Sequence, residues 1–71
     1  MLGEADYKCI ARTETYVLAQ IIGGKYNGMY TVLKHRRCRS LYYYEPICSY
    51  YHYIQPVKNI YRRLIDGSKN L

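Results

Sequence analysis

The clearest pattern in the sequence is an amphipathic stripe near the C-terminus. Its apolar members follow the i, i+3, i+4, i+7, i+8 spacing of a surface helix: Val57, Ile60, Tyr61, Leu64 and Ile65. Pro56 precedes the stripe, and proline is well tolerated at the first helical position. Gly67 follows it, at the place where glycine commonly ends a helix. The pattern predicts one short helix with a buried apolar side.

The chain before this helix is rich in β-branched and aromatic residues, which favour strands. Residues 7–22 have this character, although a helix over residues 14–22 that ends at Gly23 is the alternative. Residues 23–28 are dense in turn-forming glycine and asparagine, and residues 29–35 alternate in polarity. Two strand-like runs around a glycine-rich loop predict a β-hairpin.

Two further strands are predicted at residues 41–45 and 47–55, separated by Pro46. Residues 36–40 form a basic connector between the hairpin and these strands. The sequence therefore predicts an α+β fold, with a small antiparallel sheet of three to five strands and one short C-terminal helix packed on it. We expect a flexible acidic lead over residues 1–6, a single domain over 7–67 and a frayed tail over 68–71.

The length of 71 residues allows one small domain. No apolar run approaches the ~18 residues that a membrane span needs, and the acidic N-terminal segment lacks the features of a signal peptide. We expect a monomeric cytoplasmic protein with no membrane contact.

Charge is distributed unevenly along the chain. The 11 Lys and Arg residues outnumber the 5 Asp and Glu residues, which gives a net charge of +6. Candidate binding residues fall into an acidic lead (Glu4, Asp6), the basic connector (Arg36, Arg37, Arg39) and the helix (Lys58, Arg62, Arg63). If the helix packs across the sheet, the two basic groups can form one patch, and arginine offers bidentate contacts to phosphate or carboxylate groups.

All aromatic residues in the sequence are tyrosines, 11 in number, with no Phe and no Trp. Tyrosine suits half-buried sheet faces and interfaces, and it also stacks on nucleobases. Most of these rings are expected to pack in the core. The outward members of residues 42–44 and 50–53 are predicted to form a contact surface, with Tyr43 as a candidate binding residue.

The 3 cysteines are widely spaced, so we expect reduced thiols and not a disulfide framework. The pairs His35–Cys38 and Cys48–His52 are an alternative zinc site, although they lack the Cys-x2-Cys spacing typical of such sites. A thiolate–imidazole pair from the same residues has no orienting carboxylate nearby in sequence, and a short chain leaves little room for a cleft. The sequence predicts no enzyme, no cofactor and no metal.

Three kinds of function remain. The first is a regulator that docks on a protein of a nucleic-acid machine. The second is direct binding of single-stranded nucleic acid through a Tyr/Arg-rich sheet surface. The third is a structural subunit of a ribosome-like assembly, which the short tails disfavour. The acidic lead favours the first, because Glu4 and Asp6 suit a basic protein surface better than a phosphate backbone.

Three features of the sequence can be compared with known small proteins. The chain is short, it uses Tyr in place of Phe, and it combines Glu4 and Asp6 with Arg36, Arg37 and Arg39. In these respects the chain resembles small bacteriophage host-takeover proteins that bind bacterial RNA polymerase. The resemblance implies a transcription regulator that inhibits initiation or acts in antitermination, with host polymerase as its protein partner and nucleic acid close by. It assigns no role to an individual residue.

Overall fold

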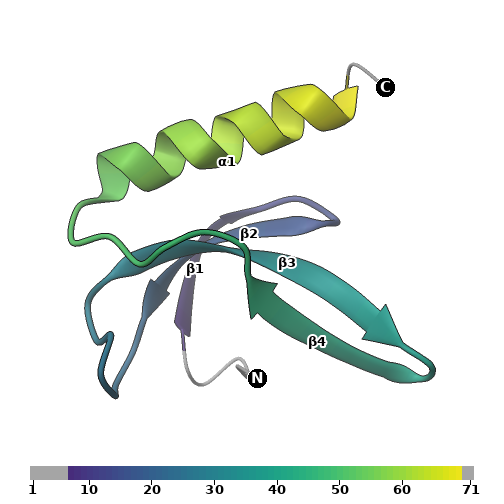
Figure 1. Ribbon diagram of the computed structural model, residues 1–71, viewed down its shortest axis with the longest axis horizontal. Helices are drawn as coiled ribbons and strands as arrows, with labels where there is room; N and C mark the ends of the chain where they lie inside the picture. The colour runs from purple at the N-terminus through teal and green to yellow at the C-terminus, as the bar shows by residue number, and fades with distance from the viewer. Residues whose placement is uncertain (1–6, 70–71) are drawn as a thin grey trace.

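A four-stranded antiparallel sheet with a single helix on one face makes up the computed structural model, which describes residues 7–69 (Figure 1). In chain order the elements are β1 (Tyr7–Arg12), β2 (Tyr16–Ile21), β3 (Tyr30–Cys38), β4 (Leu41–Pro46) and α1 (Ile54–Lys69). The strands lie in the order β1-β2-β3-β4, so each one pairs with its neighbour in sequence. The predicted α+β fold is confirmed, and the acidic lead lies outside the described residues.

The strand-like region at residues 7–22 contains two strands and not one. Thr13 makes the turn between them, because its Oγ1 accepts hydrogen bonds from the backbone N–H groups of Thr15 (3.3 Å) and Tyr16 (3.0 Å). Such side-chain bonds to the following backbone are a common way for threonine to stabilise a turn. The preference for strand over helix is confirmed for Tyr16–Ile21.

The predicted hairpin around the glycine-rich loop is β2–β3. Gly28 has a φ of 84°, a conformation that residues with a side chain rarely adopt. Its N–H donates to the carbonyl of Ile21 at 2.8 Å, and the N–H of Gly23 donates to Asn27 Oδ1 at 2.6 Å. These bonds close the loop at the end of the paired strands.

The prediction of a basic connector at residues 36–40 is wrong. Arg36 and Arg37 belong to β3 and pair with Tyr43 and Tyr42 of β4, which leaves a turn of two residues at 39 and 40. Arg39 has a φ of 58°, and its carbonyl accepts a hydrogen bond from Arg37 Nε at 3.0 Å. The run of arginines was interpreted as a loop because of its charge. Strand residues near a hairpin tip lie in water, however, and can be charged.

The prediction of a strand at residues 47–55 is also wrong, apart from an isolated bridge between Tyr30 and Tyr51. Pairing with β3 is interrupted at Cys48, whose Sγ accepts a hydrogen bond from the N–H of Val32 at 3.4 Å. The hydroxyl of buried Thr31 lies 3.3 Å from the same Sγ and from the carbonyl oxygen of Cys48. Side-chain groups therefore replace the backbone ladder only between Ile47 and Tyr51, which both keep backbone hydrogen bonds to β3.

The helix is longer than predicted at both ends. It begins at Ile54 and continues through Gly67 to Lys69, so the predicted stop at Gly67 is wrong. Residues 70 and 71 of the predicted tail lie outside the described residues. Gly67 does not have the positive φ that a glycine at a helix end commonly adopts. Within residues 7–69, no helix is long and apolar enough to cross a membrane.

Each face of the sheet has its own apolar cluster. On the side of α1, Leu18 and Val32 pack against Val57 and Tyr61 of the helix. On the opposite face, which we call the outer face, the buried residues are Tyr7, Val17, Ala19, Ile21 and Leu33. The predicted stripe is confirmed, because its remaining members Ile60, Leu64 and Ile65 pack on the helix-side cluster.

Replacing Leu33 by alanine is expected to lower the free energy of unfolding by about 2–5 kcal/mol, the usual cost of a large-to-small change in a core. Leu33 is 0% exposed and central to the outer-face cluster. Urea denaturation followed by circular dichroism measures the change, and Tyr53→Ala is the control because Tyr53 is 78% exposed. Equal stability of the two variants would contradict a core on this face.

Candidate functional site

A row of aromatic rings lies on the outer face of the sheet. The ring centroids are 5.3 Å apart for Tyr42 and His35, 5.1 Å for His35 and Tyr44, and 6.0 Å for Tyr44 and Tyr7. The guanidinium of Arg37 lies 5.6 Å from the centroid of the Tyr42 ring. We call Tyr7, His35, Tyr42 and Tyr44 the aromatic row.

Strand pairing places three of these rings side by side. His35 of β3 is opposite Tyr44 of β4, and Arg37 is opposite Tyr42. Because alternate residues of a strand point to the same face, all four side chains are on the outer face. Tyr7 of β1 reaches Tyr44 of β4 across β2 and β3, and the β2 residues Val17 and Ala19 of the same cluster are small.

The row is bordered by positive charge. Arg37 flanks it toward the hairpin tip, and Arg12 lies at its other end, in a hollow of about 240 Å³ that Tyr7 and Tyr44 also line. In β1 to β4 no Asp or Glu lies on the outer face, because the one acidic strand residue, Glu45, is opposite Lys34 on the helix side. In its strands the outer face therefore combines cations with the exposed ring of Tyr42, the half-buried rings of His35 and Tyr44 and the buried ring of Tyr7.

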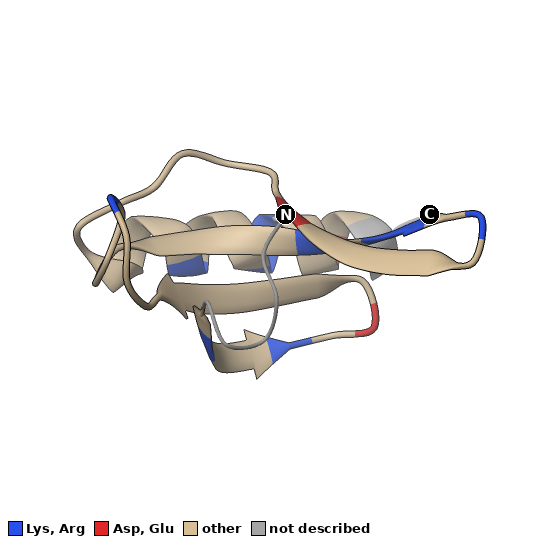
Figure 2. Cartoon of the chain, turned by 90° about the horizontal axis from the view of Figure 1, so that it is seen from below, with Lys and Arg blue, Asp and Glu red and all other residues tan. Residues whose placement is uncertain are grey.

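The predicted basic patch is divided between the two faces of the sheet. Arg36 and Arg37 are neighbours in β3, so their side chains point to opposite faces. On the helix side, Arg36 Nε donates to Glu45 Oε2 at 2.6 Å. The charge of Arg36 is therefore paired within the chain, in an exposed ion pair. Arg37 and Arg39 remain at the tip of the β3–β4 hairpin, where Figure 2 shows blue segments.

The basic residues of the helix lie elsewhere. Arg62 and Arg63 are exposed and Lys58 is half-buried, on a helix that covers the face opposite the aromatic row. The helix and the hairpin therefore do not supply one common patch to the outer face. The other two candidate residues, Glu4 and Asp6, are outside the described residues.

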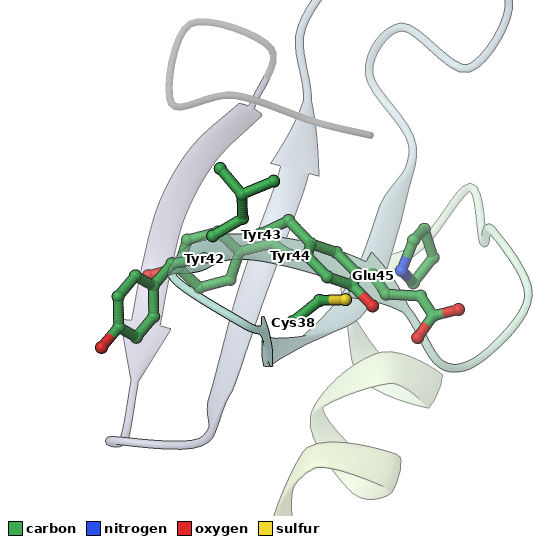
Figure 3. A pocket seen from close by; sticks show the side chains of 7 residues that line it. Cys38, Tyr42, Tyr43, Tyr44 and Glu45 are labelled. Carbon is green, nitrogen blue, oxygen red and sulfur yellow. The ribbon is translucent and has the colours of Figure 1, made fainter.

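Tyr43 is separated from its neighbours in sequence. It is half-buried on the helix side of β4, opposite Arg36, whereas Tyr42 and Tyr44 are on the outer face. A groove of about 520 Å³ runs beside this strand and is lined by consecutive residues 41–46 together with Cys38 (Figure 3). Tyr43 therefore contributes to this groove and not to the aromatic row.

The four residues of the alternative zinc site are not brought together. No group of three or more His, Cys, Asp or Glu side chains suited to a metal ion occurs within residues 7–69. His35 stacks with the rings of Tyr42 and Tyr44, and the Cys48 thiol contacts Thr31 and Val32. These contacts explain the two residues as packing elements.

A second pair of rings lies at the opposite end of the sheet from the hairpin tip. Tyr26 of the β2–β3 loop stacks on Tyr50 with centroids 4.0 Å apart and ring planes 7° from parallel. Burial, followed by the neighbouring Tyr26 and Cys48, raises the pKa of Tyr50 above its usual value. Burial, followed by Cys9, also raises the pKa of Tyr61 in the helix-side core.

These two raised pKa values predict a loss of stability in alkali. The folded state holds the phenol protons more tightly, so the stabilisation is complete below the unfolded pKa of about 10 and is lost as the pH rises through the folded value. Tyr50→Phe and Tyr61→Phe should each make the decline above pH ~10 less steep in urea titrations. Tyr53→Phe is the control for loss of an exposed phenol. A decline unchanged in both core variants would contradict the assignment.

No protein-family model, no curated protein and no solved structure matches this chain.

His35, the buried Tyr7 and Arg12 were not predicted from sequence to lie beside Tyr42 and Tyr44. The sequence did contain part of this information. Alternate residues of a strand point to the same face, which places His35 and Arg37 on one face of β3. The contact between Tyr7 and Tyr44 had no sequence signal, since it joins strands separated by 37 positions in the numbering.

Proposed function

We propose that this chain is a non-enzymatic protein that binds single-stranded nucleic acid on the outer face of its sheet. The observation that supports this most is the row Tyr7–Tyr44–His35–Tyr42, which ends at Arg37. Single strands bind proteins through aromatic side chains that stack on bases and through cations that follow the phosphate backbone. The outer face presents both kinds of group next to each other.

The shape of the site also supports a single strand over a duplex. The exposed ring of Tyr42 and the half-buried rings of His35 and Tyr44 lie on a sheet face that the helix does not cover, where a splayed base can reach Tyr42. A base within a duplex has both faces covered by its neighbours. Sheets with exposed aromatic residues are a recurrent platform for such recognition. Rings accept every base, so we expect little sequence preference.

The number of cations limits the affinity. Arg12, Arg37 and Arg39 are the arginines on the outer face or at the hairpin tip, and each can contact one phosphate. Binding of a single strand then depends on salt with a slope of about −0.7 for each phosphate contact. We expect a modest salt dependence, together with a large contribution from stacking.

The first test uses a fluorescently labelled oligonucleotide of mixed sequence and fluorescence anisotropy. Tyr42 is 61% exposed, and Tyr42→Ala should weaken binding by about 1–3 kcal/mol, the usual value of one base–aromatic stack. Arg37→Gln should reduce the salt slope by about 0.7. The matched controls are Tyr53→Ala and Arg62→Gln, which change an exposed tyrosine and an exposed arginine away from the row. If controls and test variants bind equally, the outer face is not the site.

The docking regulator predicted from sequence is the second candidate. Arg39, Leu41 and Tyr42 are exposed at the hairpin tip, and Tyr and Arg are enriched among the residues that anchor protein contacts. Bacterial RNA polymerase is the partner that the resemblance suggests. The acidic lead, which the sequence argument assigns to this partner, distinguishes the two candidates.

The paired change Glu4→Lys and Asp6→Lys should weaken binding to purified bacterial RNA polymerase, because it replaces the negative charges that would meet a basic protein surface. Binding to the oligonucleotide should stay equal or become stronger. Biolayer interferometry measures both, with Glu4→Gln and Asp6→Asn as the variant that removes charge without reversal. No binding of the parent chain to polymerase would exclude this candidate.

A further inference from the structure

We propose that β4 is a self-association edge, along which two copies of this chain pair antiparallel about a two-fold axis at Tyr43. β4 is the last strand of the sheet, so one of its sides has no neighbouring strand among the described residues. The proposal concerns association of the protein alone and does not depend on nucleic-acid binding.

Some backbone N–H and C=O groups of β4 point away from β3 and are placed to pair with another strand. The N–H of His35 donates to the carbonyl of Thr15 at 2.7 Å, on the β2 side of β3. The backbone N–H and C=O groups of the alternate β3 residues, Lys34 and Arg36, therefore point toward β4. The backbone groups of their partners Glu45 and Tyr43 point back toward β3. The N–H and C=O groups of Tyr42 and Tyr44 consequently point outward, ready to pair with another strand.

The two edges of the sheet differ in the features that prevent edge pairing. At β1 the register shifts between Cys9 and Ala11, and exposed Lys8 and Arg12 carry charge along the strand. Bulges and charged residues are common protections of an edge strand. At β4 the run Leu41–Tyr44 is regular and uncharged, and the charge and the proline of this strand come at its end, with Glu45 and Pro46, so β4 is less protected than β1 along its length.

The groove beside β4 fits an added strand. Consecutive residues 41–46 line it, and Figure 3 shows side chains of this run around β4. Because consecutive strand residues alternate between faces, the groove is lined from both faces of this edge strand. α1 packs on β2 and β3, and the groove lining contains no helix residue. A second sheet can therefore approach with its helix on the same side.

The occupant is a second copy because the strand is complementary to itself. Pairing about Tyr43 places Tyr42 opposite Tyr44 of the second copy, which matches the outward backbone groups and gives aromatic cross-strand pairs. It also places Glu45 opposite Leu41 of the second copy, beside the basic hairpin tip with Arg39. Glu45 keeps its ion pair with Arg36 of its own chain, so the basic tip of the second copy adds a longer-range attraction at each end of the paired strands.

The two-fold axis gives a sharp test, because Tyr43 is the one strand position that faces itself. Tyr43→Glu places two carboxylates opposite each other in the dimer, while within one chain it places Glu opposite Arg36. Tyr43→Lys places two ammonium groups there. An equimolar mixture pairs Glu with Lys and should restore association. Tyr53→Glu is the control for an added charge at an exposed position.

Sedimentation velocity and native mass spectrometry measure the outcome, and circular dichroism checks folding. Because a six-residue edge is a small interface, we expect a dimer whose fraction rises with protein concentration. Parent and Tyr53→Glu should dimerise, each Tyr43 variant should be monomeric, and the mixture should form the heterodimer. A parent chain that stays monomeric, as the sequence analysis expects, overturns the proposal. Dimeric Tyr43→Glu, or folded variants that do not form a heterodimer, overturn it as well.

Discussion

The burial of β3 on both faces is the constraint on which the rest of this structure depends. Val32 and Leu33 are adjacent and both fully buried, one beneath α1 and the other in the outer-face cluster. A small domain buries a limited part of its surface, so a strand that contributes to two clusters supplies much of its stability. β2 and β4 take their register from this strand.

The same alternation determines the surface. Once Leu33 is buried on the outer face, His35 and Arg37 must follow it on that face, and their partners Tyr44 and Tyr42 come with them. Lys34 and Arg36 are directed to the helix side, where Glu45 is available as a partner. The aromatic row and the separation of the basic residues are therefore consequences of core packing, and a shift of one residue would exchange the two faces.

The proposals for nucleic acid and for self-association concern adjacent parts of one hairpin. The aromatic row uses the outer face of β4, whereas the edge uses its outward backbone groups and Tyr43 on the helix side. Pairing of two copies would place Tyr42 of each chain against Tyr44 of the other, which would extend the row across both sheets. The two-fold test leaves the side chains of the row unchanged, so each proposal can fail alone.

The sequence by itself determined the elements with a clear local pattern: the helix with its buried stripe, the hairpin at the glycine-rich loop and the strand at residues 41–45. These depend on side-chain periodicity and on turn residues, which act over a few positions. It did not determine the strand character of Arg36 and Arg37 or the loop at Cys48, because in both places the partner strand decided the backbone bonds. Only the tertiary structure decided which tyrosines meet, since contacts such as Tyr7 with Tyr44 join strands that are distant in sequence.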